Sequence, residues 1–118
     1  MARHESDDAQ LSTVAVEVLL TLVEGPLHGY AIKQAIEARI DNDFVLGSGS
    51  LYQALHRLER RGLVAEVARA RPKDARRGRV YRLEPDGRRV LALELTRMKR
   101  VLAHAKRARF ALDPEGTR

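Results

Sequence analysis

The fold is decided by residues 50–61, SLYQALHRLERR, which Gly62 follows. Leu51, Leu55 and Leu58 recur at spacings of four and three, so they share one face of a helix. The other face of that helix is polar, and a glycine after the last turn favours a left-handed helix end. The stretch therefore predicts an amphipathic helix that buries its leucines and presents polar side chains.

Two more helices are predicted ahead of this stretch. The first starts near Leu11, carries apolar residues three and four apart, and ends at residues 25–26, Gly-Pro. The second covers about residues 28–40, with residues 41–43 as a turn and residues 47–50 as a flexible, cap-rich start of the next helix. The order helix, helix, turn, helix is typical of a helix-turn-helix domain.

After Gly62 the pattern changes from helical to extended. Residues 63–67 and 79–83 are predicted as strands, and residues 69–78 between them hold turn formers and many cations. Two strands that close on such a loop form a β-hairpin with a basic tip, which is a wing.

A long last helix is predicted from Arg88 to about Phe110, after the start signal at residues 85–87. Its apolar residues follow a heptad-like spacing of four and three: Leu91, Leu95, Met98, Leu102 and Ala105. Such a seam would meet a second copy of the chain, and the alternative, a seam packed only on the chain's own first helix, stays open. The expected dimer interface consists of Val18, Leu22, Leu91, Leu95, Met98 and Leu102.

The composition limits the class of protein. A chain of 118 residues, 44% hydrophobic and 32% charged, predicts one domain with an aliphatic core. The absence of cysteine excludes disulfides and Cys-ligated zinc, and the four histidines are widely spaced, so we expect no metal and no cofactor. No apolar stretch approaches the ~20 residues of a membrane span, and no apolar signal segment opens the chain. These features favour a soluble, cytoplasmic protein.

The charge is distributed unevenly around a net value of +6. Residues 1–56 carry 3 basic and 8 acidic side chains, whereas residues 57–79 carry 9 basic and 3 acidic ones. A local basic block is typical of proteins that bind the phosphate backbone of nucleic acids. A solvated, arginine-rich surface would give the same pattern.

Three segments resemble the PadR family of bacterial regulators. Residues 20–32 contain a His-Gly-Tyr signature, residues 49–63 are similar to that family's recognition helix, and residues 79–87 are similar to its second wing strand. Two positions depart from the family pattern, because Gln53 stands where Pro is frequent and Glu84 where Thr is frequent. The resemblance implies a homodimeric, usually repressing regulator of double-stranded DNA, and in many members a small apolar or aromatic effector.

The expected fold class is mainly α with a small β-hairpin: a winged helix-turn-helix plus a long C-terminal dimerisation helix. The expected divisions are a disordered segment at residues 1–9, a DNA-binding domain at 10–84, the helix at 85–112 and a flexible tail at 113–118.

Candidate DNA contacts lie on the 50–61 helix opposite its leucines. Gln53 can pair in bidentate fashion with an adenine, and Arg57 can reach a guanine or a phosphate. The resemblance favours a contact between the Tyr52 hydroxyl and the DNA backbone, against a half-buried core ring, and His56 is either a contact or a solvated imidazole. The expected DNA-binding set is Ser48, Ser50, Tyr52, Gln53, His56, Arg57, Lys73, Arg76, Arg77 and Arg79.

The remaining residues of this set have positional reasons. Ser48 and Ser50 would donate hydroxyl hydrogen bonds to phosphates near the start of their helix, and the wing cations would meet the backbone or the minor groove. His28 and Tyr30 are expected to stabilise the junction between the first two helices.

Two other function classes compete with this interpretation. An enzyme is disfavoured, because residues 47–50, Gly-Ser-Gly-Ser, lack the Gly-Lys-Ser/Thr ending of a phosphate loop and no informative histidine–carboxylate spacing accompanies them. The alternative binding function is a basic helical adaptor for an acidic protein or an anionic membrane surface. That alternative leaves the predicted wing without a role.

Overall fold

The computed structural model describes residues 11–39, 48–67 and 79–111 of the chain. Within these ranges the chain forms four helices and a small sheet, in the order α2 (Thr13–Thr21), β1 (Leu27–His28), α3 (Gly29–Arg39), α4 (Ser48–Arg60), β2 (Val64–Glu66), β3 (Val80–Leu83) and α5 (Pro85–Arg107). The expected fold class, mainly helical with a small antiparallel sheet, is confirmed.

The helix ends follow local chemistry. Ser12 caps α2, since its hydroxyl accepts a hydrogen bond from the backbone N–H of Ala15 at 3.1 Å. Gly62 adopts the left-handed conformation, with φ of 76°, just after α4. Pro85 opens α5, where its missing N–H costs no helical hydrogen bond. Against the sequence-based bounds, α2 ends earlier, α4 starts two residues sooner, and α5 covers Pro85–Arg107.

The sheet has one strand more than the predicted hairpin. β1 pairs with β3 in antiparallel fashion, with Leu27 opposite Tyr81 and His28 opposite Val80, so the strand order is β1-β3-β2. The predicted second helix therefore starts at Gly29 and not at His28. A strand of two residues is too short for its alternation to show in a sequence.

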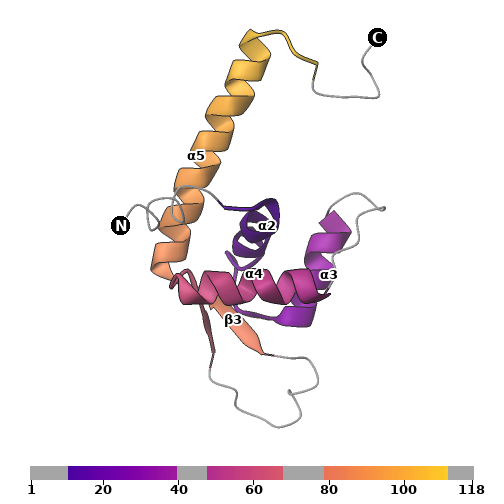
Figure 1. Ribbon diagram of the computed structural model, residues 1–118, viewed down its shortest axis with the longest axis vertical. Helices are drawn as coiled ribbons and strands as arrows, with labels where there is room; N and C mark the ends of the chain where they lie inside the picture. Colours follow the sequence, from indigo (N-terminus) through magenta and orange to yellow (C-terminus); the bar gives the residue numbers. More distant parts are fainter. Residues whose placement is uncertain (1–10, 40–47, 68–78, 112–118) are drawn as a thin grey trace.

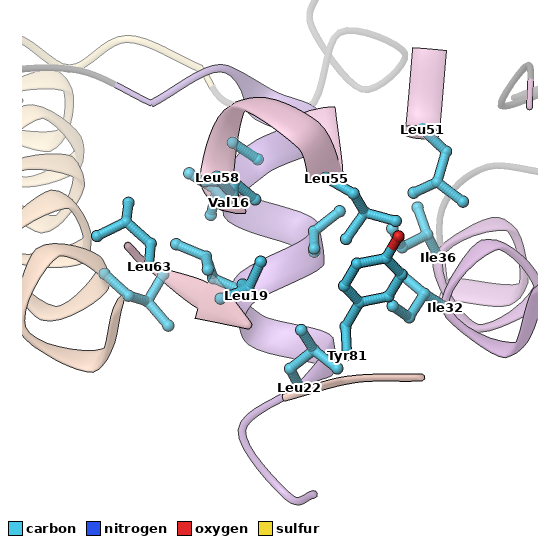
Figure 2. Packing of buried hydrophobic residues seen from close by; sticks show 14 of the residues in the cluster. Val16, Leu19, Leu22, Ile32, Ile36, Leu51, Leu55, Leu58, Leu63 and Tyr81 are labelled. Carbon is cyan, nitrogen blue, oxygen red and sulfur yellow. The ribbon is translucent and has the colours of Figure 1, made fainter. Parts of the chain in front are cut away.

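The core is aliphatic and centres on α2, which contacts α3, α4 and α5. Figure 2 shows leucines of α4 and isoleucines of α3 converging on this helix, together with the ring of Tyr81 from β3. The largest side chains that are almost fully buried are Val18, Leu19, Leu22, Ile32, Ile36, Leu51, Leu55, Leu58, Leu63 and Val64. Burial also raises the pKa of the Tyr81 hydroxyl above its ordinary value, with a smaller contribution from Glu59.

Helix α5 starts on the domain and then extends away from it (Figure 1). Its first turns are anchored: Val90 and Leu91 are buried, and Arg88 donates a hydrogen bond from Nη2 to the backbone oxygen of Val23 at 3.0 Å. Beyond Glu94 the side chains of α5 are mostly exposed. About half of this helix therefore stands outside the core of its own protomer.

A backbone contact fixes α5 against the end of α4. The N–H of Glu84 donates to the carbonyl oxygen of Leu63 at 3.0 Å. A β-carbon at position 87 would lie only 2.2 Å from that same oxygen and 2.8 Å from Cδ1 of Leu83. Only glycine fits here, because the obstructing atom belongs to the backbone and cannot rotate away.

We therefore expect Gly87→Ala to lower the free energy of unfolding by about 3 kcal/mol, the upper range for forced overpacking. Gly49→Ala is the matched control, since a β-carbon on Gly49 would have no heavy atom within 4 Å. In an exposed helical position, replacement of glycine by alanine raises the free energy of unfolding by at most about 1 kcal/mol. Chemical denaturation of both variants measures the difference, and equal stability of Gly87→Ala and the unsubstituted protein would contradict the contact.

Candidate nucleic-acid interface

The exposed face of α4 is polar along its whole length. Ser50, Gln53, His56, Arg57 and Arg60 are exposed, while the three leucines of the opposite face are 0 to 2% exposed. The predicted orientation of this helix is confirmed. The predicted contact residues Ser50, Gln53, His56 and Arg57 are thus available to a partner, and Ser48 is the first residue of the helix.

The charge of α4 is uncompensated on this face. Arg57 and Arg60 lie in its last turn, and its first turn contains no acidic side chain. Within residues 11–39, 48–67 and 79–111, neither arginine forms an ion pair with another residue of those ranges. The positive end of the helix dipole at the start of α4 and the two arginines in its last turn make the face suited to an anionic partner.

The base of the wing lies beside this helix. β2 and β3 pair with Val64 opposite Leu83 and Glu66 opposite Tyr81. In Figure 1 β3 lies below α4, while α5 rises on the other side. Arg79, just before β3, is well exposed and forms a loose ion pair with Glu66 at 3.6 Å. The predicted wing contacts Lys73, Arg76 and Arg77 lie outside the described residues.

Tyr52 combines the two roles considered for it. Its side chain is 41% exposed, yet its ring covers Gly29 at the start of α3. A β-carbon on Gly29 would lie 2.8 Å from the Tyr52 hydroxyl oxygen and 3.0 Å from Cε1. The ring is therefore held at one edge while its remainder faces outward.

Tyr30 and His28 differ from each other in a way that sequence reasoning missed. Tyr30 is 55% exposed, so the expected packing role at the helix junction is wrong for this residue. His28 is half-buried in β1, and its Nε2 is buried with no hydrogen-bond partner among the described residues. The exposure of Tyr30 could have been predicted from helical geometry, because Tyr30 lies about 200° around α3 from Ile32, which is buried.

The expected dimer interface divides into two parts. Val18, Leu22 and Leu91 are 0, 1 and 4% exposed and belong to the core of their own protomer, so they offer no surface to a second copy. Leu95, Met98 and Leu102 are 36, 37 and 47% exposed. The first turns of the seam thus pack within the chain, in agreement with the alternative of packing on the chain's own helices. The side chains of the later turns are exposed.

A carboxylate marks the point where the seam leaves the core. The Glu94 side chain is almost fully buried, and its Oε2 accepts a hydrogen bond from Nη2 of Arg97 at 2.5 Å. This hydrogen bond raises the pKa of Arg97, which stays charged. The buried carboxylate is therefore satisfied by a partner on the same helix.

No group of three or more histidine, aspartate or glutamate side chains among the described residues is arranged to hold a metal ion. Among the described helices, none has both the length and the apolar character needed to cross a membrane.

The sequence has relatives among known regulators. The sequence model of the Transcriptional regulator PadR-like family matches residues 18–93. The Transcriptional regulator Rv3488 of Mycobacterium tuberculosis is 34% identical over 82 residues, which cover 70% of this chain and 72% of that protein. An uncharacterized 37.1 kDa protein of transposon TN4556 from Streptomyces fradiae is 43% identical over 96 residues, 81% of this chain but only 24% of that protein.

Solved structures show the same architecture. A PadR family transcription regulator from Clostridium difficile superposes with a TM-score of 0.69 at 20% identity, over 81% of this chain and 97% of its own. Bacillus subtilis PadR, solved in complex with operator DNA, gives 0.57 at 18% identity, over 92% of this chain and 54% of its own. At these identities the likeness establishes the fold, and the sequence match to the family extends over more than half of the chain. This protein belongs to the PadR-like family of transcriptional regulators.

Proposed function

We propose that this chain is a sequence-specific DNA-binding repressor that occupies an inverted-repeat operator as a homodimer. The observation that carries the proposal is the orientation of α4, whose leucines are buried and whose polar, cationic face is exposed. A helix of this shape fits the major groove of B-DNA. The operator complex of Bacillus subtilis PadR supports the same use of the fold.

Each part of the interface has a chemical task. Gln53 reads adenine through its amide, and Arg57 contacts a guanine or a phosphate. Ser48 and Ser50 and the N–H groups at the start of α4 bind backbone phosphates. The wing cations, Lys73, Arg76, Arg77 and Arg79, meet the backbone or the minor groove beside the helix.

The homodimer is proposed to form through the open turns of α5. Leu95, Met98 and Leu102 lie on one stripe of this helix, exposed in the single chain. Pairing two such stripes removes them from water and holds two α4 helices about 34 Å apart, one turn of DNA. The division into a DNA-binding domain at residues 10–84 and a dimerisation helix at 85–112 follows from this arrangement.

The repressing action follows from occupancy, because a dimer bound over a promoter excludes other proteins from it. A small apolar or aromatic effector would act by shifting the spacing of the two α4 helices. This function places the protein with the DNA, in the cytoplasm. The competing function, a basic adaptor for acidic proteins or anionic membranes, requires no duplex preference.

Selection of bound sequences from random duplex DNA tests the proposal. We expect an inverted repeat whose half-sites are centred about 10 base pairs apart, one turn of DNA. Enrichment of no duplex sequence, together with binding to acidic protein or anionic vesicles, would favour the adaptor.

Specific and nonspecific contacts are separable by mutation. Gln53→Ala should change the preferred base at one position of each half-site, by about 1–3 kcal/mol of discrimination. The double change Arg76→Gln and Arg77→Gln should instead weaken binding to every duplex and lower the slope of log K against log salt by about 2. Titrations at several salt concentrations measure both, and a full salt slope in the double variant would refute the wing assignment.

The dimer seam has a matched control on its own helix. Leu102→Glu should convert the dimer to a monomer and reduce operator affinity at least tenfold, because it places a charge in the apolar contact. Leu93→Glu is the control, since Leu93 is 61% exposed and nine residues away, half a turn around the helix. Sedimentation equilibrium measures the association, and a Leu102→Glu protein that stays dimeric would exclude this seam.

A further inference from the structure

The exposed large hydrophobic side chains of the described residues fall into two groups. One is found on α2, α5 and the residues just after α5: Leu20, Leu93, Leu95, Met98, Val101, Leu102 and Phe110. The other consists of Tyr30 on α3 and Tyr52 on α4. Leu95, Met98 and Leu102 of the first group belong to the proposed dimer contact, whereas Leu93 lies on the opposite side of α5. The two tyrosines carry hydroxyl groups, which suit a partner that offers hydrogen-bond acceptors.

Tyr30 adjoins the proposed DNA surface through its neighbour Gly29. The ring of Tyr52 covers Gly29, as the 2.8 Å approach of its hydroxyl to a β-carbon position shows. The N–H of Gly29 donates to the carbonyl oxygen of Arg79 at 3.0 Å. Position 29 thus joins the exposed face of α4 to the base of the wing, and Tyr30 is the next residue along the chain.

The surroundings of Tyr30 favour an anion. The first turn of α3 contains no acidic side chain, and Tyr30 lies in that turn, at the positive end of the helix. Among the described residues, the Arg79 side chain forms one ion pair, at the surface with Glu66, and such pairs contribute little to stability, so this pair does not keep the arginine from a phosphate. The Tyr30 hydroxyl is a hydrogen-bond donor at the start of a helix whose first backbone N–H is hydrogen-bonded to Arg79.

We propose that Tyr30 is a DNA-backbone contact whose hydroxyl donates a hydrogen bond to a phosphate oxygen at the edge of the groove that α4 enters. This assignment rests on the proposed function and adds a residue from α3 to the interface. The contact positions the protein and carries no sequence information. Because the tyrosine side chain carries no positive charge, this contact releases no counterion from the DNA.

The test is Tyr30→Phe, which removes one oxygen atom from an exposed side chain. We expect an unchanged thermal midpoint and an affinity for every duplex that falls about tenfold, the value of one hydrogen bond to a charged acceptor. The slope of log K against log salt should stay that of the unsubstituted protein, unlike the result for a lost arginine contact.

A scan of the operator with single methylphosphonate substitutions locates the partner of the hydroxyl. At one phosphate in each half-site, the neutral substitution should weaken the unsubstituted protein but not the variant, so that their affinities become equal. Equal affinity of the two proteins for the unmodified duplex, or a loss that persists at every position of the scan, would overturn the role of Tyr30 alone. If the unsubstituted protein binds no duplex, the proposed function fails, and this assignment with it.

Discussion

The leucine face of α4 packs against α2 and α3, and this contact determines which side chains the molecule can offer a partner. Leu51, Leu55 and Leu58 are at most 2% exposed. Loss of one such side chain typically costs about 2–5 kcal/mol, a large share of the stability of a small domain. Rotation of α4 would expose these leucines and bury arginines without partners. The polar face is therefore outward because the apolar face has no alternative position.

The second constraint couples DNA binding to association. Leu63 ends the turn after α4, and its carbonyl oxygen lies against the first turn of α5 at Gly87. The close approach leaves little freedom between the two helices. A change in the way two α5 helices meet would consequently move both α4 helices. An effector that binds at the α5 seam would therefore alter the position of α4 through the contact between Leu63 and Gly87.

The sequence predicted the parts of the fold that rest on periodicity, and it missed those that depend on a neighbour. The leucine spacing oriented α4 correctly, and Gly62 marked its end. β1 was not predicted, because two residues are too few to show the alternation of a strand. It is a strand because it pairs with β3. The four-and-three spacing of α5 located an apolar stripe, but spacing does not reveal what covers it. Leu91 belongs to the core of its own chain for that reason, whereas Leu102 is open. The packing role expected for Tyr30 was wrong because this residue lies on the side of α3 opposite the buried Ile32.

The central claim is that two α4 helices are held one turn of DNA apart by the open turns of α5. The chain has no cysteine, so a single His56→Cys substitution allows one spin label per protomer on the exposed face of α4. Pulsed electron–electron resonance on the free protein then measures the distance between the two labels. We expect a distribution centred within about 10 Å of 34 Å. An absent intermolecular signal, or a distribution centred beyond about 60 Å, would contradict it, because two such helices could not enter successive turns of one groove.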